Sequence, residues 1–176
     1  MKVDKIITGY LEENCYVLTK DNNCLIIDPG DDFFPIKNVI GNNRVLAVLL
    51  THNHFDHIGA VEDIVDKYQV PVYSFANLKE GCCDIENFKF QVIYTPGHTI
   101  DSISFYFAQE KVMFTGDFLF KKSIGRWDLE TGNYDSMKKS ISKIKKYPSD
   151  TIIYPGHGES TILGYEKDHN QYLFTN

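Results

Sequence analysis

The aliphatic run Val45–Leu50 leads directly into the segment Thr51–His57, which carries three histidines and an aspartate. An unbroken aliphatic run of this length predicts a strand buried on both faces, because a strand with one wet face alternates apolar and polar residues. In open α/β sheets, functional side chains gather where strands end. The pattern therefore predicts a layered α/β fold with chemically active side chains at the end of a central strand.

Several further β-rich runs predict sheet structure around this strand. We expect strands at Lys2–Thr8, Asn14–Leu18, Cys24–Asp28, Val70–Phe75, Phe88–Tyr94, Ser102–Ala108, Lys111–Thr115 and Thr151–Tyr154. The third of these runs ends in the turn sequence Asp28-Pro29-Gly30. There Asp28 either orients a ligand histidine or is an ordinary turn residue.

Two segments carry apolar residues at helical spacing, and they predict two amphipathic helices. The first begins near Gly59 and ends before Pro71. The second follows Asp135, which is the predicted N-cap. The tail Tyr165–Leu173 is predicted to form a last short helix.

The charge balance and the start of the chain argue against several classes of partner. The 176 residues include 18 Lys and Arg and 24 Asp and Glu, which gives a net charge of −6. A negative net charge argues against binding of nucleic acid through electrostatic attraction. The opening residues Met1–Ile7 lack the apolar core of a signal peptide, and Val45–Leu50 is too short to span a bilayer. No low-complexity linker divides the chain. We therefore expect residues 1–176 to form one cytoplasmic domain without membrane or nucleic-acid partners.

The cysteine spacing predicts reduced thiols. Cys15, Cys24 and the adjacent pair Cys82-Cys83 form no C-x-x-C motif and no zinc-ribbon pattern. The alternative is a redox device formed by the vicinal pair.

The histidine-rich segment has the spacing of a metal-ligand strip. His52 and His54 are two residues apart, so in an extended segment both side chains point the same way and can share one metal. Asp56 and His57 lie where the chain turns towards the first helix, so they can hold a second metal. Imidazole and carboxylate are ligand types that suit zinc and iron.

Three further donors each follow a predicted strand and a glycine: His98, Asp117 and His157. Glycine permits tight turns that bring the backbone close to a metal. Alone, each of the three would more often be a turn or capping residue. With the strip they complete five histidines and two carboxylates, which suit two metals with one bridging carboxylate. His169 lacks such a setting and is expected to be an exposed helix residue.

Together these motifs resemble the metallo-β-lactamase superfamily, and within it the short, glyoxalase II-like branch. The resemblance rests on Thr51–His57, Gly97-His98-Thr99, Gly116-Asp117 and Gly156-His157-Gly158 in this order. It extends to Asn14-Cys15-Tyr16, Asp28-Pro29-Gly30, Gly116–Phe120, Gly125-Arg126-Trp127-Asp128 and the tail residues Gly164-Tyr165-Glu166, Asn170 and Leu173. It implies a four-layer αββα sandwich with the metals at one edge of its two sheets.

The resemblance also implies the ligand sets. The first metal would be held by His52, His54 and His98, the second by Asp56, His57 and His157, and Asp117 would bridge them. The implied cofactors are two divalent ions, zinc in the first place and iron or manganese as alternatives. Two-zinc β-lactamases usually have a cysteine where Asp117 stands, so the aspartate points to the branch that cleaves thioesters.

The leading hypothesis is hydrolysis of a small-molecule thioester of the S-acylglutathione type, such as S-lactoylglutathione, by a metal-bridging hydroxide. Asp56 and Asp117 would be catalytic, and Asp56 would also take a proton from the attacking water. Arg126 matches a basic glutathione-contacting position and would bind a substrate carboxylate, unless it only pairs with Asp128. Glyoxalase II proper adds a C-terminal glutathione-binding helical domain, which this chain is expected to lack.

Two other reactions compete with this hypothesis. The first is that of the persulfide dioxygenases, which resemble the same pattern, including a Gly-Arg-x-Asp stretch. These enzymes use one ferrous iron held by two histidines and an aspartate. The type and number of bound metal ions therefore distinguish a dioxygenase from the two-metal hydrolase. Another hydrolase of the superfamily, with a substrate other than glutathione thioesters, is the second alternative. The negative net charge argues against a nuclease. The number of donor residues argues against a closed structural metal site, which normally holds one ion.

Overall fold

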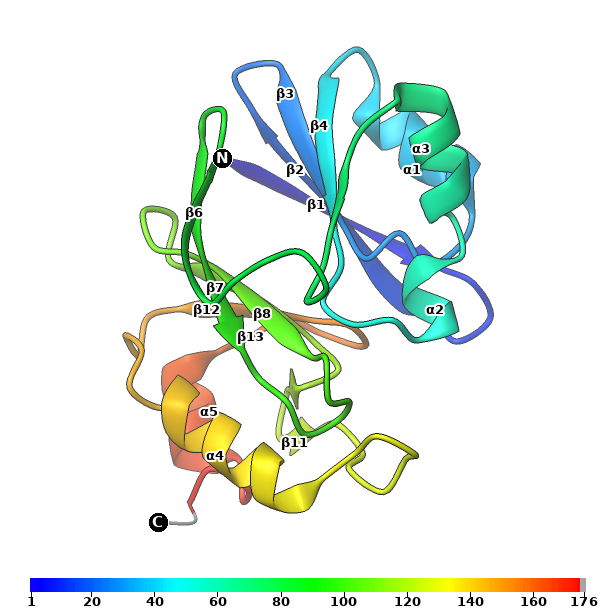
Figure 1. Cartoon of the computed structure of the whole chain (residues 1–176). Helices are drawn as coiled ribbons and strands as arrows, with labels where there is room; N and C mark the ends of the chain where they lie inside the picture. The colour runs from blue at the N-terminus through cyan, green and yellow to red at the C-terminus, as the bar shows by residue number, and fades with distance from the viewer. Residues whose placement is uncertain (175–176) are drawn as a thin grey trace.

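The computed structural model describes residues 1–174 and arranges them in two stacked sheets (Figure 1). The first sheet has the order β1-β2-β3-β4-β5. Its strands are β1 (Lys2–Thr8), β2 (Glu13–Lys20), β3 (Asn23–Ile27), β4 (Arg44–Leu49) and β5 (Val72–Tyr73). The first three strands pair antiparallel, and β4 and β5 are added in parallel.

The second sheet has the order β13-β12-β9-β8-β7-β6. Its strands are β6 (Gly81–Ile85), β7 (Phe88–Tyr94), β8 (Ile103–Phe107), β9 (Val112–Gly116), β12 (Ile152–Pro155) and β13 (Thr161–Ile162), and β10 (Leu119–Phe120) and β11 (Ser123–Ile124) form a small separate hairpin. Both β7 and β9 are antiparallel to β8, and β12 is parallel to β9. The carboxyl ends of β7, β9 and β12 therefore lie at the same edge of the sheet.

Five helices complete the described part of the chain: α1 (Phe33–Ile40), α2 (Phe55–Ile58), α3 (Val61–Tyr68), α4 (Tyr134–Ile144) and α5 (Leu163–His169). Helices α1 and α3 lie against the first sheet, whereas α4 and α5 lie against the second (Figure 1). The short helix α2 lies just beyond the end of β4.

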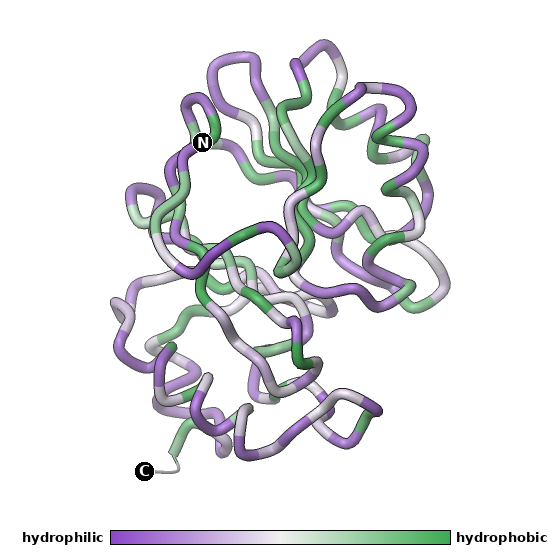
Figure 2. The backbone as a smooth tube through the Cα atoms, viewed as in Figure 1, coloured by the Kyte–Doolittle hydropathy of each residue, from purple (hydrophilic) through white to green (hydrophobic). Residues whose placement is uncertain are grey.

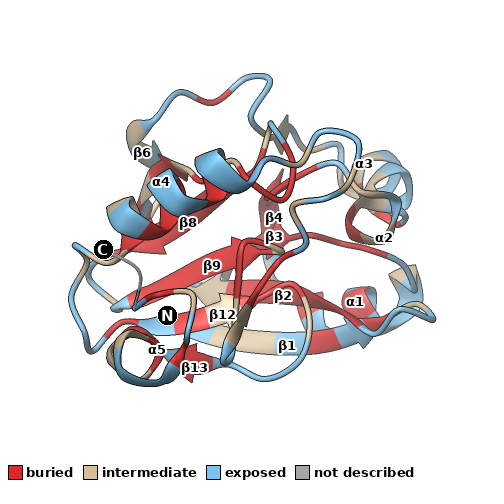
Figure 3. Ribbon diagram, turned by 90° about the horizontal axis from the view of Figure 1, so that it is seen from below, coloured by how far each residue is buried: buried red, intermediate tan, exposed pale blue. Residues whose placement is uncertain are grey.

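The side-chain alternation of β2 explains this layering, because successive strand residues point to opposite faces. Tyr16 and Leu18 belong to the core between the two sheets, whereas Cys15 and Val17 belong to the core beneath α1 and α3. A third core lies between the second sheet and the helices α4 and α5. Figure 3 shows the buried strands between partly exposed helices. The predicted four-layer αββα sandwich is thereby confirmed.

The run Val45–Leu50 is buried throughout, and it supplies both faces of the first sheet as predicted. Figure 2 shows hydrophobic residues along β3 and β4, whereas the outer helices alternate between hydrophobic and hydrophilic. The predicted strand Val70–Phe75 is shorter, because β4 pairs only with Val72 and Tyr73. The last helix spans Leu163–His169 rather than Tyr165–Leu173, with His169 exposed as expected.

The N-cap prediction at Asp135 is wrong. Asn133 has an extended backbone, and its side-chain oxygen accepts a 2.8 Å hydrogen bond from the backbone N–H of Ser136. Asp135 lies inside the first turn, where it pairs with Lys138. Asparagine and aspartate cap helices comparably well, so residue type alone did not distinguish the two positions.

Within residues 1–174, no helix is both long enough and apolar enough to cross a membrane. The four cysteines are free thiols, as expected: Cys15 and Cys24 are buried, whereas Cys82 and Cys83 are at least partly accessible.

Candidate metal centre

The candidate ligands follow the carboxyl ends of strands in both sheets. His52 follows β4, His98 follows β7, Asp117 follows β9 and His157 follows β12. A backbone hydrogen bond of 2.8 Å from Ile103 at the start of β8 to the carbonyl of Thr51 joins the two sheets at this edge. Residues far apart in the sequence therefore meet at one site, as the strand-end pattern predicted.

Three histidines form the first ligand set. Nδ1 of His54 lies 3.1 Å from Nε2 of His52 and 3.0 Å from Nε2 of His98. Burial lowers the pKa of His52 well below its ordinary value and also lowers the pKa of His54, and neighbouring imidazoles add to both effects. Both rings are therefore neutral at neutral pH, which is the form that binds metal.

Asp56, His57 and His157 form the second set. Oδ2 of Asp56 lies 3.3 Å from Nε2 of His157 and 3.9 Å from Nε2 of His57. Asp56 and His57 come from α2, which begins two residues before His57. The backbone turns from an extended conformation at His54 into α2. The His57 ring stays close to the first set, with its centroid 4.2 Å from that of His52.

Asp117 lies between the two sets. Its Oδ1 is 3.4 Å from Nε2 of His57, and its Oδ2 is 3.6 Å from Nε2 of both His98 and His157. Burial favours the neutral acid, but the neighbouring His57 outweighs this effect and holds the pKa of Asp117 well below its usual value. An ionised carboxylate in contact with both sets is placed as a bridging ligand.

The donor atoms fit a pair of metal ions. Within each three-residue set the ligand atoms lie within 4.8 Å of one another. Among residues 1–174, Nε2 of His57 and Oδ1 of Asp117 are buried without a hydrogen-bond partner. Buried polar atoms are normally paired, so unpaired nitrogen and oxygen atoms that face one another indicate a cation between them. Histidine nitrogens and carboxylate oxygens are ligands that zinc and iron accept.

The outer ring nitrogens of three ligand histidines are fixed by oxygen acceptors. Nδ1 of His98 donates to the carbonyl of Arg126 at 2.8 Å, and Nδ1 of His157 donates to the carbonyl of Leu11 at 3.1 Å. Nδ1 of His52 lies 3.1 Å from the hydroxyl oxygen of Thr51, which donates its own hydrogen to Oδ2 of Asp28 and can therefore accept from His52. Each contact places the hydrogen on Nδ1 and leaves the lone pair of Nε2 facing the centre.

Asp28 contacts a candidate ligand histidine, which was one of the two roles that the sequence left open. Its backbone is left-handed, with φ of 47°. Its Oδ2 lies 3.1 Å from Nδ1 of His57, and its Oδ1 accepts a 2.7 Å hydrogen bond from the backbone of Thr51. Asp28 therefore orients one ligand directly and the start of the ligand strip through Thr51.

Glu13 is a buried acid that the sequence did not single out. The hydroxyl of Thr8 donates a 2.7 Å hydrogen bond to its Oε2, and its Oε1 lies 3.6 Å from Nδ1 of His57. Burial raises the pKa of Glu13 to about 9 despite the opposing charge of His57. Its backbone also forms an isolated antiparallel bridge with His157. The sequence feature that could have drawn attention to Glu13 is its position as the first residue, and the single charged residue, of the otherwise uncharged run Glu13–Leu18.

Glycines allow this close approach of backbone to ligands. A Cβ added at Gly156 would lie 2.3 Å from Oδ1 of Asp117 and 2.7 Å from Cε1 of His57. At Gly116, which has φ of +49°, it would lie 2.2 Å from the hydroxyl of Thr51. Any side chain at these two positions would displace the second ligand set or the ligand strip.

Arg126 is exposed, and its guanidinium pairs with Asp128. Nε and Nη2 each donate a 3.0 Å hydrogen bond to one oxygen of that carboxylate. Only the backbone carbonyl of Arg126 contacts the candidate centre, through His98. The pairing with Asp128 is the alternative that the sequence left open, and the substrate contact stays a prediction.

The comparisons with known proteins agree with this geometry. A family model described as "Metallo-beta-lactamase superfamily" matches residues 8–82 and 75–157. The chain is 33% identical to the "Probable metallo-hydrolase YqgX" of Bacillus subtilis (strain 168), over 98% of each chain. It is 31% identical to the "Hydroxyacylglutathione hydrolase GloC" of Haemophilus influenzae (strain ATCC 51907 / DSM 11121 / KW20 / Rd), again over 98% of each.

Two solved structures extend the similarity to three dimensions. The BLEG-1 B3 metallo-beta-lactamase superposes with a TM-score of 0.94 at 35% identity, covering 99% of this chain and 100% of that one. TTHA1623 in a di-iron-bound form superposes with a TM-score of 0.88 at 31% identity, covering 97% of this chain and 100% of that one. On its sequence, its fold and its ligand geometry, the chain belongs to the metallo-β-lactamase superfamily.

Proposed function

We propose that this chain hydrolyses thioesters of the S-acylglutathione type with two divalent metal ions, zinc in the first place. The observation that carries the proposal is the position of Asp117, which contacts one histidine of the first ligand set and two of the second. Support also comes from the relatives, one named a metallo-hydrolase and one a hydroxyacylglutathione hydrolase. The di-iron-bound form of TTHA1623 keeps iron as the alternative metal.

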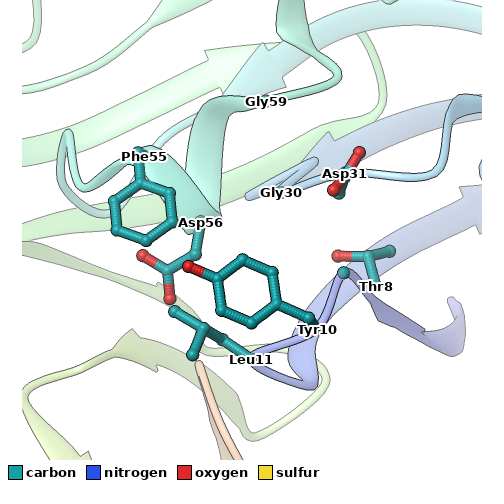
Figure 4. Close-up of a pocket in the computed structure, with 9 residues that line it drawn as sticks. Thr8, Tyr10, Leu11, Gly30, Asp31, Phe55, Asp56 and Gly59 are labelled. Atoms are coloured by element: carbon teal, nitrogen blue, oxygen red, sulfur yellow. The ribbon is translucent and has the colours of Figure 1, made fainter.

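Different residues of the chain have different roles in the proposed hydrolysis. Bound divalent metal ions would lower the pKa of water and polarise the substrate carbonyl. Asp56, whose carboxylate is partly accessible and points into a surface pocket (Figure 4), takes a proton from the attacking water. Asp117 and the outer-nitrogen contacts of the histidines keep the ligand sets in place while charge develops.

The overall chemistry is balanced without a strong general acid. The water oxygen forms a bond to the acyl carbon, and the bond between that carbon and sulfur breaks with its electron pair leaving on sulfur. One water proton ends on the thiol, and the other is released when the product acid ionises. A thiolate leaves readily, so the site needs no buried acid beside the leaving group.

Arg126 is proposed to bind a carboxylate of the thiol carrier. Its guanidinium is exposed and already holds a carboxylate in the two-pronged geometry that a substrate carboxylate would use. On binding, the substrate carboxylate would replace that of Asp128 as the partner of the Arg126 guanidinium. The backbone of Arg126 contacts His98, so a group bound at this side chain lies close to the first ligand set.

One observation supports a second candidate reaction, the hydrolysis of β-lactams. The BLEG-1 structure, described as a B3 metallo-beta-lactamase, is 35% identical to this chain. Hydrolysis of a β-lactam would need the same attack on a carbonyl carbon but would expel a nitrogen leaving group, which requires a proton donor. Thioesters therefore remain the first choice, and a cephalosporin is the necessary comparison substrate.

The test is a substrate panel on protein purified without added metal or chelator. Release of thiol from S-lactoylglutathione and related thioesters, with no turnover of a chromogenic cephalosporin, is the expected result. Turnover of the cephalosporin alone would replace the proposed reaction with β-lactam hydrolysis. Oxygen uptake with glutathione persulfide, without thioester cleavage, would replace it with a dioxygenase reaction.

A further inference from the structure

A small apolar pocket opens directly beside the second ligand set, and Asp56 belongs to both. We infer that this pocket receives the acyl group of the substrate and selects uncharged, apolar acyl chains over short hydroxyacyl groups such as lactoyl. The inference rests on the proposed thioester hydrolysis and adds the class of acyl group to it.

The pocket lies between the loop that joins β1 to β2 and the beginning of α2. It has a volume of about 200 Å³, and its walls include Thr8, Tyr10, Leu11, Asp31, Phe55 and Asp56. Figure 4 shows the rings of Tyr10 and Phe55 on either side of the Asp56 carboxylate, with Leu11 below. A cavity of about 150 Å³ holds a benzene molecule, so the pocket is large enough for a pentanoyl or phenyl-sized group.

The walls expose an unusual amount of apolar surface to water. Tyr10 is 81% exposed, Phe55 63% and Leu11 42%. The two rings are nearly parallel, with an interplanar angle of 23° and centroids 6.5 Å apart. Apolar surface gathered around a polar centre marks a place where an apolar group binds, since covering it removes unfavourable contact with water.

The pocket is fixed in position relative to the candidate metal centre. The carbonyl of Leu11 accepts the 3.1 Å hydrogen bond from Nδ1 of His157, which is a ligand of the second set. On the other side, Phe55 and Asp56 are consecutive residues of α2. Both walls are thus attached to ligand residues, so an acyl chain in the pocket would keep its carbonyl carbon at the centre.

The loop that carries Tyr10 is itself anchored. The backbone N–H of Gly9 donates a 2.9 Å hydrogen bond to Oδ2 of Asp32, and the N–H of Glu12 donates at 3.3 Å to the carbonyl of Gly9. These bonds fix the backbone on both sides of Tyr10, and the Tyr10 ring is placed at the pocket by stacking on Phe55. A preformed wall costs little conformational entropy on binding.

The charges around the pocket oppose an anionic acyl group. Both titratable groups in its lining, other than the Tyr10 phenol, are carboxyls, Asp31 and Asp56. A terminal carboxylate on the acyl chain would meet Asp31, which is not a candidate metal ligand, and would find no basic side chain among the described residues of the lining. An uncharged chain of the same length avoids this repulsion.

The experiment compares three glutathione thioesters that differ only in the acyl group: lactoyl, pentanoyl and glutaryl. The last two have the same chain length and differ by a terminal carboxylate. We expect kcat/KM for the pentanoyl thioester to exceed that for each of the others by about tenfold or more, the scale on which an apolar pocket discriminates. Equal values for all three would overturn the inference while leaving thioester hydrolysis intact.

The variants locate the preference in the pocket. Tyr10→Ala should lower kcat/KM for the pentanoyl thioester by about tenfold and change the value for the lactoyl thioester less than about twofold. Tyr10→Phe should retain the preference, because the ring is kept. Ile162→Ala, which removes an exposed apolar side chain from β13 in the other sheet, is the matched control and should change neither value. An equal loss on all substrates in Tyr10→Ala would contradict the assignment.

Binding of pentanoate, measured by titration calorimetry, separates this inference from the proposed reaction. If no thioester is hydrolysed, the proposed function fails, but weaker pentanoate binding in Tyr10→Ala than in wild type would still support an apolar pocket. Identical pentanoate binding in the two proteins would overturn the pocket whatever the reaction.

Discussion

Oε1 of Glu13 lies 3.6 Å from Nδ1 of His57, and both side chains are fully buried. His57 belongs to the candidate second set, although its ring also lies close to His52, and the backbone of Glu13 pairs with His157 of the second set. Glu13 thus supports one half of the candidate centre and makes no such contact with the first three histidines.

Replacing Glu13 should therefore weaken the second metal site selectively. Glu13→Leu removes the oxygen near His57, and we expect about tenfold or greater loss of affinity for the second metal, the usual scale for a group that orients a ligand. Glu13→Gln keeps an oxygen and should retain both metals. Elemental analysis after dialysis measures the outcome, with Glu62→Leu on the exposed side of α3 as control. Equal loss of both metals in Glu13→Leu would show a general structural role instead.

Asp117→Ala should abolish metal binding and activity together. The substitution removes the carboxylate that contacts both ligand sets and leaves the buried Nε2 of His57 without its nearest anion. We expect a loss of activity of at least about a thousandfold, as for removal of a group that organises a catalytic site. Metal content and kcat/KM are the measurements. Full activity in this variant would refute the bridging assignment.

Metal binding at the second site should release a proton, whereas binding at the first should not. Although burial opposes the charge, Asp117 and Asp28 raise the pKa of His57 well above its ordinary value, so the metal-free ring is protonated at neutral pH. His52 has a lowered pKa and is already neutral. Affinity at the second site should thus rise with pH towards the pKa of His57. Calorimetry in buffers of different ionisation enthalpy would detect the proton, and two proton-free binding events would contradict this expectation.

The metal-free protein should lose stability as pH rises from about 7 to about 9, a range in which His52 and His54 are largely neutral in both the folded and the unfolded state. The pKa of Glu13 is about 9 in the folded protein against an ordinary 4.5, and the pKa of His57 is also raised. In this window the folded state holds more protons than the unfolded state, so the free energy of unfolding falls with increasing pH. Tm of chelator-treated protein across this range tests the sign. Glu13→Gln should flatten the slope, and a Tm that increases with pH would contradict the assignment.

Arg126→Ala should raise KM for glutathione thioesters several-fold and leave kcat nearly unchanged. Among residues 1–174 the exposed guanidinium bonds only to Asp128, so its loss should not disturb the fold. Asp128→Asn, which weakens the competing pair, should lower KM instead. Steady-state kinetics on an anionic and a neutral thioester provide the measurement. An unchanged KM in Arg126→Ala would remove this residue from the substrate site.

The ligand positions could be predicted from the sequence because each is encoded locally. Each of His98, Asp117 and His157 follows an apolar run and a glycine, and His52 and His54 have the spacing of a strip. Parallel strands then bring such positions to one edge without further information. Their convergence was therefore predictable even though their distances were not.

Other features depend on contacts between distant segments and left weak local signals. Helix α1 buries Ile36 and Ile40, but Phe34 and Val39 are apolar and exposed, so apolar residues are not confined to one face and no helical periodicity stands out. Glu13 is the first residue of β2, and β3, α1 and β4 lie between that strand and His57, so nothing in the sequence pairs the two residues. The apolar pocket likewise depends on how the loop after β1 packs against α2.

The most direct test of the two-metal centre is the metal content of protein purified without added metal or chelator. Elemental analysis should give close to two metal ions per chain, because the two ligand sets lie on either side of a shared carboxylate, Asp117. One iron per chain, with other metals near zero, would contradict the two-metal hydrolase and indicate a mononuclear centre instead.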